Sequence, residues 1–313
     1  MIMQDPLLTI ICLAYNHEDN IRKTLDGFLA QQTSFGFEIW IHDDASTDNT
    51  QSVLKEYRDR YPDKIKLTLQ SVNQLSQGIM PLTTYVFPHL TSKYLAFCEG
   101  DDFWTDSLKL ERQVSVLEAD PTLSMCVHDV NLVFESGVQA VPNFYTKPYS
   151  CDFEFTFMDE LKSPFFSTAS LVTRLDLVRK QPKNHVMMIS GDLKLFFHLL
   201  SHGNGFYIND VMATKRKNPG GVTQSDDYRQ KLFEGSYELL LYIKPFAPRE
   251  ARRYIRLAMG EFERFFLSRR THIKRHSKWQ LLIRALIHDP VWWSRKPRFS
   301  FWGGFLPHKA RVK

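Results

Sequence analysis

Four apolar stretches, each followed by a segment with apolar residues at helical spacing, dominate the first 120 residues of the chain. The stretches cover residues 7–15, 37–44, 65–70 and 93–102. A continuous apolar run is typical of a strand that is buried on both faces. Because such strands alternate with amphipathic helices, the pattern predicts an α/β domain with a mostly parallel sheet flanked by helices.

Polar side chains follow three of these predicted strands at the point where each strand ends. They are Tyr15 and Asn16 after the first strand, Asp43 and Asp44 after the second, and Glu99, Asp101 and Asp102 after the fourth. In sheets of this kind, ligands bind at the carboxyl ends of the strands. Carboxylates this close together repel one another unless a cation lies between them. We therefore expect a site for a divalent metal, or for a substrate that brings one.

The composition is that of a globular protein. The chain has 313 residues, of which 43% are apolar and 24% are charged, so it can bury a core. No apolar run has the length that spans a bilayer, and the N-terminus has no basic leader, so we expect no signal peptide. The four cysteines have neither disulfide nor metal-ligand spacing, which predicts reduced thiols in a cytoplasmic protein.

Three segments together resemble a known family. "TIICLAYNHEDNIRKTLDGFLAQQ", "FEIWIHDDASTDNT" and "KYLAFCEGDDFW" are similar to the nucleotide-sugar-binding half of bacterial-type family 2 glycosyltransferases, which have the GT-A fold. The resemblance covers about residues 7–130 and weakens through residue 225. It implies a Rossmann-like GT-A domain over residues 1–225, with a nucleotide-sugar-binding half at 1–125 and an acceptor half at 126–225.

The resemblance also implies an activity. Such an enzyme is an inverting glycosyltransferase that moves a sugar from a UDP- or dTDP-sugar to a hydroxyl of a glycan or lipid-linked acceptor, in the biosynthesis of a surface polysaccharide such as lipopolysaccharide or capsule. The Gln-x-x-Arg-Trp signature of processive synthases is absent, which favours single additions. The arginine-containing segment that many relatives carry before the fourth strand is not recognisable in "NQLSQGIMPLTTYVF".

The resemblance assigns roles to the polar residues at the strand ends. Asp44 corresponds to the carboxylate that accepts the N3–H of the base, and Tyr15 and the Leu13 backbone would line the same pocket. Asp101 would lie near the ribose. Asp102 would hold Mg²⁺ or Mn²⁺, which neutralises the diphosphate as it leaves.

Ordinary turn chemistry is the alternative for these acids, since Asp is common after strands. We favour that alternative for Asp43, whose side chain would serve its own loop, but not for Asp44. It is also disfavoured for Asp101 and Asp102, because adjacent acids at the end of an apolar strand are costly without a purpose. Glu99 is expected at the rim of the site.

The general base is expected in the second half of the chain, opposite the diphosphate. "ISGDLKLFFHLL" resembles the family segment that carries this base, and the match places Asp192 in the role. The alternative is that Asp192 only favours a helix N-terminus.

A basic segment follows later in the chain. "KRKNPGGV" resembles the loop that many relatives close over the donor phosphates, so Lys215, Arg216 and Lys217 are candidate phosphate contacts. A solvated basic turn is the alternative.

Positive charge is concentrated in the C-terminal part. Residues 249–313 carry 17 Lys or Arg and 4 Asp or Glu, which gives a net charge of +13. Residues 1–248 carry 23 Lys or Arg and 31 Asp or Glu, which gives a net charge of −8.

Four tryptophans lie among the basic residues of the C-terminal part, and indoles prefer the membrane interface. We therefore expect a helical, basic extension over residues 226–313 that contacts an anionic membrane surface through residues 249–313. This predicts a peripheral protein on the inner face of the cell membrane. Nucleic acid is the rival partner, which the resemblance to sugar transfer disfavours.

Two other functions compete with sugar transfer. A nucleotidyltransferase of nucleotide-sugar synthesis would carry a glycine-rich, arginine-containing loop after the first strand, where this chain has "AYNHEDN". A non-catalytic sugar-binding relative would not need Asp44, Asp102 and Asp192 together. We therefore favour the enzyme.

Overall fold

The computed structural model describes residues 5–134, 151–162, 167–182, 191–217, 226–268 and 288. The chain forms two units that interleave along the sequence. The first comprises Met1–Phe155, Phe165–Met187 and His202–Gly221, and the second comprises Thr156–Pro164, Met188–Ser201 and Val222–Lys313.

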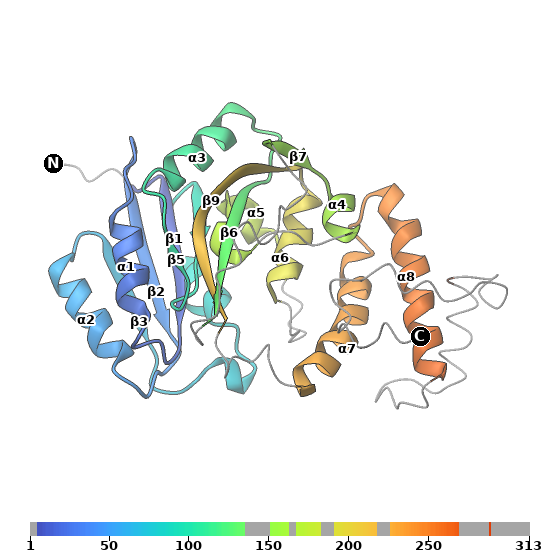
Figure 1. Cartoon of the computed structure of the whole chain (residues 1–313), viewed down its shortest axis with the longest axis horizontal. Helices are drawn as coiled ribbons and strands as arrows, with labels where there is room; N and C mark the ends of the chain where they lie inside the picture. Colours follow the sequence, from blue (N-terminus) through green and yellow to red (C-terminus); the bar gives the residue numbers. More distant parts are fainter. Residues whose placement is uncertain are drawn as a thin grey trace. The chain divides into compact units, whose positions relative to one another are not determined.

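The first unit contains one mixed sheet (Figure 1). Within the described residues, the strands join in the order β3-β2-β1-β4-β8-β6-β9-β5, and β7 pairs with β9. The bounds are β1 Leu8–Ala14, β2 Phe37–Asp43, β3 Ile65–Leu69, β4 Tyr94–Phe97, β5 Phe103–Trp104, β6 Met125–Phe134, β7 Phe153–Phe155, β8 Val172–Arg174 and β9 Gly205–Lys217. β1 to β4 are parallel, whereas β8 is antiparallel to β4 and β6. The predicted α/β sheet is therefore present, with antiparallel strands in its second half.

Helices follow the strands as the sequence pattern predicts. α1 (Ile21–Leu29), α2 (Thr50–Arg60) and α3 (Lys109–Ala119) come after β1, β2 and β5, and the short α5 (Leu175–Arg179) follows β8. α1 and α2 lie side by side along β1–β3 (Figure 1). α1 buries its apolar stripe, because Ile21, Leu25 and Phe28 recur at helical spacing.

The segment between β3 and β4 forms short turns of helix. η1 (Leu75–Gln77) and η3 (Phe87–His89) are 3₁₀ turns, and η2 (Leu82–Val86) is a π-helical turn. These turns cover the end of β2, where they become part of the candidate site.

β4 is shorter than the strand predicted over residues 93–102. It ends at Phe97, so Glu99, Asp101 and Asp102 lie in the turn that leads to β5. Gly100 is required in this turn, since a Cβ there would lie 2.7 Å from the Nδ1 of His17 and 3.0 Å from Ile21. The close approach brings the acidic turn against the loop that follows β1.

A buried lysine lies at the start of α3 and contacts the Trp104 ring of β5. Lys109 at the start of α3 is fully buried, and its Nζ donates to Gln113 Oε1 over 2.7 Å. The same ammonium lies 4.1 Å from the centroid of the Trp104 ring. Burial lowers the pKa of Lys109 to about 7. Gln113 in turn donates to the carbonyls of Cys126 and Ser170, so one polar cluster joins α3 to β6 and to the segment before β8.

The second unit is helical. Its described helices are α4 (Phe157–Lys162), α6 (Gly191–Leu200), α7 (Asp226–Ile243) and α8 (Arg249–Ser268). Residues 226–243 and 249–268 of the predicted C-terminal extension are thus helical, as expected. The buried carboxylate of Glu263 on α8 accepts a hydrogen bond from Tyr237 and lies 3.0 Å from the Nδ1 of His288. These contacts join α7 and α8 to His288, which lies further along the extension.

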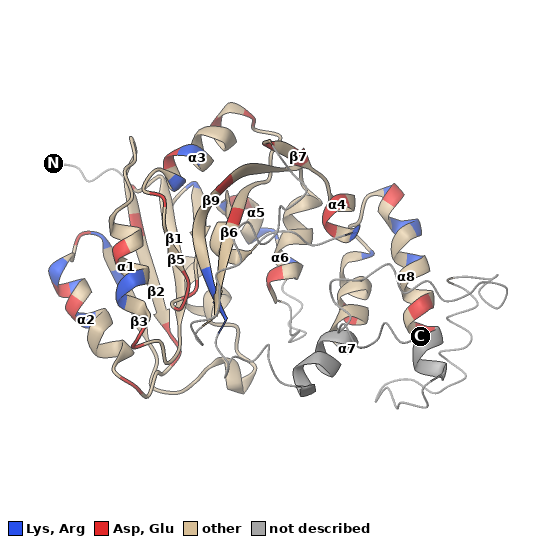
Figure 2. Ribbon diagram, viewed as in Figure 1, with Lys and Arg blue, Asp and Glu red and all other residues tan. Residues whose placement is uncertain are grey.

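α8 presents two different faces. Its buried side chains are Ala251, Ile255, Ala258, Met259 and Phe262, whereas Arg252, Arg253 and Arg256 are exposed. Figure 2 shows that positive and negative segments both occur along this helix. Among the described residues, no helix is long and apolar enough to cross a membrane. The extension beyond α8, apart from His288, lies outside the described residues.

Candidate active site

Backbone hydrogen bonds tie the ends of β2 and β4 to the end of β1. The N–H of Asp44 donates to the Ala14 carbonyl over 3.0 Å, and the N–H of Gly100 donates to the Leu13 carbonyl over 2.8 Å. The loop after β2 and the turn after β4 therefore flank residues 13 and 14 on either side. The polar groups at three strand ends meet at one edge of the sheet, as the sequence pattern predicts.

Asp44 is a buried carboxylate that is held by backbone donors. It is 6% exposed. Its Oδ1 accepts the N–H of Gln74 over 2.8 Å, and its Oδ2 accepts the N–H of Leu75 over 3.0 Å. Each carboxylate oxygen has two acceptor positions, so both oxygens can still accept a hydrogen bond. Tyr15, one residue beyond β1, is 45% exposed, which leaves its ring open to a ligand.

Asp43 serves its own loop, as expected. Its Oδ1 accepts hydrogen bonds from the Ser46 N–H over 3.0 Å and from the Gln51 side chain over 2.6 Å, and its Oδ2 accepts the Ser46 hydroxyl. The adjacent Asp43 and Asp44 carboxylates therefore have different partners: Asp43 accepts three hydrogen bonds from Ser46 and Gln51, whereas Asp44 accepts two from Gln74 and Leu75.

The carboxyl end of β9 runs beside the acidic turn. β5 and β9 pair Phe103 with Thr214, so the basic residues that follow lie next to Asp101 and Asp102. The Arg216 N–H donates to Asp102 Oδ1 over 2.8 Å, and its guanidinium donates to the Asp101 carbonyl over 2.6 Å. Figure 2 shows the positive end of β9. The structure thus brings together two predicted site residues, Asp102 and Arg216, that are 114 residues apart along the chain.

The electrostatic environment of Asp102 is unusual for a carboxylate. The residue is 2% exposed, and burial raises its pKa well above the usual range. Glu99 and Asp101 raise the pKa further, whereas Lys215 and the Arg216 N–H lower it. Burial also raises the pKa of the Cys12 thiol, with a contribution from the same carboxylates. The turn is therefore a site of negative potential that a cation would stabilise.

These carboxylates fit an ion that is shared with a diphosphate. The described residues contain no group of three or more His, Cys, Asp or Glu side chains placed to hold a metal. Mg²⁺ is usually bound by one or two carboxylates together with substrate phosphates. Asp102, desolvated and beside the N–H of Arg216, has the character of such a ligand.

Asp192 lies in the second unit, in the first turn of α6. Its side chain is exposed, and its Oδ1 accepts the N–H of Leu193 over 2.9 Å. This is a local helix-terminal contact, so the role of general base stays a prediction. The residues "NPGG" of the predicted phosphate loop lie outside the described residues.

Sequence reasoning missed several residues around the site. Gln74 and Leu75 hold Asp44, although their segment carries no motif. Lys23 on α1 lies 3.7 Å from the Phe103 ring centroid, and Arg216 lies 4.6 Å from it. Lys23 is a lysine on the exposed face of α1, and Gln74 is a single glutamine. Neither belongs to a sequence pattern, so the sequence did not predict that they would lie at the site.

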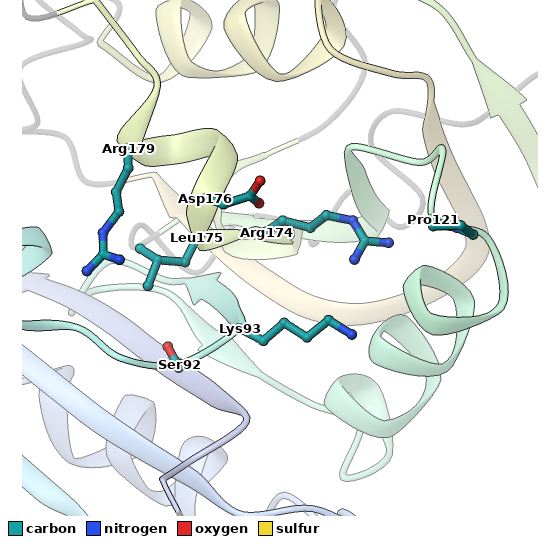
Figure 3. A pocket seen from close by; sticks show the side chains of 7 residues that line it. All are labelled: Ser92, Lys93, Pro121, Arg174, Leu175, Asp176 and Arg179. Carbon is teal, nitrogen blue, oxygen red and sulfur yellow. The ribbon is translucent and has the colours of Figure 1, made fainter.

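A hollow of about 380 Å³ lies at the other end of β4 (Figure 3). It is lined by Ser92, Lys93, Pro121, Arg174, Leu175, Asp176 and Arg179. Ser92 and Lys93 precede β4, whereas the acidic turn follows it. The Arg174 guanidinium donates to the Leu117 carbonyl at the end of α3 over 2.5 Å, and Arg179 donates to the Leu90 carbonyl over 2.6 Å. The arginines of this hollow therefore have structural partners, and the hollow is separate from the candidate site.

Comparison with known proteins identifies relatives. The sequence model described as Glycosyl transferase family 2 matches residues 9–180. Rv1520, an uncharacterized protein of Mycobacterium tuberculosis, is 34% identical over 218 residues, which are 70% of this chain and 61% of the relative. This chain therefore spans less than two thirds of the length of that relative.

Two further matches extend the comparison. The Escherichia coli UDP-Glc:alpha-D-GlcNAc-diphosphoundecaprenol beta-1,3-glucosyltransferase WfgD is 31% identical over 115 residues, which are 37% of this chain and 42% of the relative. The crystal structure of Staphylococcus aureus TarS 1–349 in complex with UDP aligns with a TM-score of 0.60 at 17% identity, over 90% of this chain and 81% of that chain. At this identity, the likeness to TarS shows the fold alone.

The raised pKa of Asp102 predicts a pH-dependent effect of Asp102→Asn on stability. A carboxylate whose folded pKa lies above its unfolded value stabilises the fold at low pH, and this contribution is lost as the pH rises through the folded pKa. One group changes the free energy of unfolding by at most about 1.4 kcal/mol per pH unit. Asparagine keeps an oxygen for the Arg216 N–H but cannot ionise, so the variant should become more stable than the wild type as the pH rises.

Urea unfolding from about pH 4 to pH 8, in a chelating buffer, measures this difference. Asp192→Asn removes an exposed carboxylate and is the control, which should follow the wild type. Parallel stability curves for Asp102→Asn and the wild type would contradict a desolvated carboxylate at position 102.

Proposed function

Because the chain belongs to glycosyl transferase family 2, we propose that it is a glycosyltransferase that moves a sugar from a nucleoside diphosphate sugar to a hydroxyl group of a glycan or lipid-linked acceptor. The observation that supports this most strongly is the pairing of the buried Asp102 carboxylate with the basic end of β9 at the carboxyl edge of the sheet. A diphosphate needs both a cation-binding carboxylate and cationic contacts. The name of WfgD, which includes UDP-Glc, supports a uridine diphosphate sugar as the donor, or a thymidine diphosphate sugar, whose base presents the same ring N–H.

The donor base lies against Asp44 and Tyr15 in this proposal. Uracil and thymine present one ring N–H, and Asp44 has acceptor positions left after its bonds to Gln74 and Leu75. The exposed ring of Tyr15 and the backbone of Leu13 form the wall of the base pocket. Asp101 lies near the ribose, because it follows Gly100, which is hydrogen-bonded to Leu13.

Asp102 is the ligand of Mg²⁺ or Mn²⁺. When bound, the ion neutralises the charge that develops on the departing diphosphate. Lys215 and Arg216 contact the phosphates, since the main chain of Arg216 is already fixed against Asp102. The same hydrogen bond holds the metal-binding carboxylate in one orientation.

Asp192 acts as the general base. It takes the proton from the acceptor hydroxyl while that oxygen forms a bond to the anomeric carbon and the bond to the diphosphate breaks. A single in-line attack of this kind inverts the anomeric centre. The exposed position of Asp192 leaves its carboxylate accessible to an acceptor.

The basic extension places the enzyme on a membrane. Arg252, Arg253 and Arg256 are exposed on α8, and basic residues near a surface are attracted to anionic lipids by about 1 kcal/mol each. We propose that residues 249–313 contact the cytoplasmic face of the cell membrane, where a lipid-linked acceptor would be available.

Asp44→Ala should weaken the binding of UDP by about 1.5–3 kcal/mol, the usual contribution of a hydrogen bond to a charged group. Titration calorimetry with UDP, dTDP and GDP in the presence of Mn²⁺ measures the loss and the base preference. Asp59→Ala, which removes an exposed carboxylate on α2, is the control and should bind UDP as the wild type does. Equal UDP affinity of Asp44→Ala and the wild type would remove Asp44 from the site.

Asp192→Asn should reduce sugar transfer by roughly 10²–10⁴-fold, the usual effect of a positioned base, and should leave UDP affinity nearly unchanged. Asp176→Asn changes the equivalent acidic position in the first turn of α5 and should retain transfer. Proton NMR of the product of an α-linked donor should show a β-glycoside. Near-normal transfer by Asp192→Asn would exclude it as the base.

The 313-residue protein should sediment with vesicles that contain anionic lipid, and salt should release it because screening weakens charge attraction. Vesicles of neutral phosphatidylcholine are the control and should not bind it. Binding that is the same with both vesicle types, or that does not change with salt, would argue against an electrostatic contact.

A further inference from the structure

His42 is a buried histidine beside the carboxylate that is proposed to bind the base. It lies on β2, two residues before Asp44, and is 0% exposed. Within the described part of the chain, neither of its ring nitrogens has a hydrogen-bond partner. Its Nε2 lies 3.8 Å from Asp44 Oδ1, which is longer than a hydrogen bond. Buried polar groups are normally paired, so this near contact requires an explanation.

The ring of His42 is fixed relative to Asp44 by a closed set of contacts. It stacks on Tyr85, with ring centroids 5.8 Å apart and an interplanar angle of 25°. The Tyr85 hydroxyl donates to Gln74 Oε1 over 2.9 Å, and the Gln74 N–H donates to Asp44 Oδ1 over 2.8 Å. The segment between β3 and β4 therefore holds both the imidazole and the carboxylate. A small rotation of Asp44 would bring Oδ1 within hydrogen-bond distance of Nε2.

We infer that His42 is a positioning residue, which donates its Nε2–H to Asp44 Oδ1 when a nucleotide is bound and thereby orients the carboxylate toward the base. This inference rests on the proposed function, since it requires that Asp44 contact the base. Burial lowers the pKa of His42, against the opposing effect of Asp44. The neutral imidazole is thus the donor at neutral pH.

This contact would also select the base. With Oδ1 accepting from both Gln74 and His42, and Oδ2 accepting from Leu75, one acceptor position is left on the carboxylate. Uracil and thymine offer one ring N–H and need one acceptor. Guanine offers two adjacent N–H donors and would leave one of them unpaired. His42 therefore favours uridine and thymidine nucleotides over guanosine nucleotides.

Two variants of His42 separate hydrogen bonding from packing. His42→Phe keeps an aromatic ring against Tyr85 but removes the donor, whereas His42→Gln keeps an N–H donor at a similar distance from the backbone. His128→Phe on β6 is the control, because His128 is also fully buried with an unpaired Nε2. We expect His42→Phe to raise the Kd for UDP about 3–10-fold, the usual range for one hydrogen bond, and to reduce the preference for UDP over GDP. UDP binding by His42→Gln and His128→Phe should stay within about twofold of the wild type.

The same titrations in an Asp44→Ala background test whether His42 acts through Asp44. His42→Phe should then cause no further loss of affinity. If Asp44→Ala weakens UDP binding but His42→Phe does not, or if His42→Phe weakens it equally in both backgrounds, the positioning role is wrong and the proposed function stands. If Asp44→Ala binds UDP as tightly as the wild type, both the positioning role of His42 and the base-binding role of Asp44 are wrong.

A second measurement follows the histidines of the wild-type protein directly. Proton–nitrogen NMR of the histidine rings should show a downfield shift of one Nε2–H signal when UDP is added, as the bond to the carboxylate forms. The signal should be absent from the spectrum of His42→Gln. Histidine signals that do not change on saturation with UDP would overturn the inference.

Discussion

The parallel pairing of β1 with both β2 and β4 decides where the polar groups of this protein meet. β1 runs through the middle of the parallel strands, so the loop after β2 and the turn after β4 are both hydrogen-bonded to its last residues. Asp44 is thereby fixed on one side of β1 and the acidic turn on the other. Parallel strands place their carboxyl ends at the same edge, and every residue assigned to donor binding depends on this arrangement.

The acidic turn shows a conflict between stability and ligand binding. Asp102 is buried beside other carboxylates, and its pKa is raised accordingly. Such a group destabilises the fold at neutral pH unless a cation is present, and this is common at sites that bind charged ligands. The Arg216 N–H reduces the conflict without removing it, because it satisfies only one of the carboxylate oxygens. In the proposed function, an ion shared with a diphosphate would supply the compensating positive charge.

The side of the site that is proposed to bind the base is built differently from what the family resemblance suggests. The segment before β4 has no arginine, and the structure shows that it instead holds Asp44 through two backbone N–H groups and stacks Tyr85 on His42. Polar contacts of the main chain and of side chains thus take the place of an arginine in this segment. We propose that these contacts limit the free acceptor positions on the Asp44 carboxylate. The choice of base then depends on how many N–H donors the base presents.

The sequence by itself determined the alternation of strands and helices, the placing of acids directly after β2 and β4, and the helices α7 and α8, because these follow from local periodicity and turn chemistry. It did not determine the antiparallel insertion of β8 between β4 and β6, or the contact of Arg216 with Asp102, which are 114 residues apart. Nor did it predict the approach of His42 to Asp44 under Tyr85. These features depend on how distant segments pack, and packing energies between distant residues leave no periodic signal in the sequence.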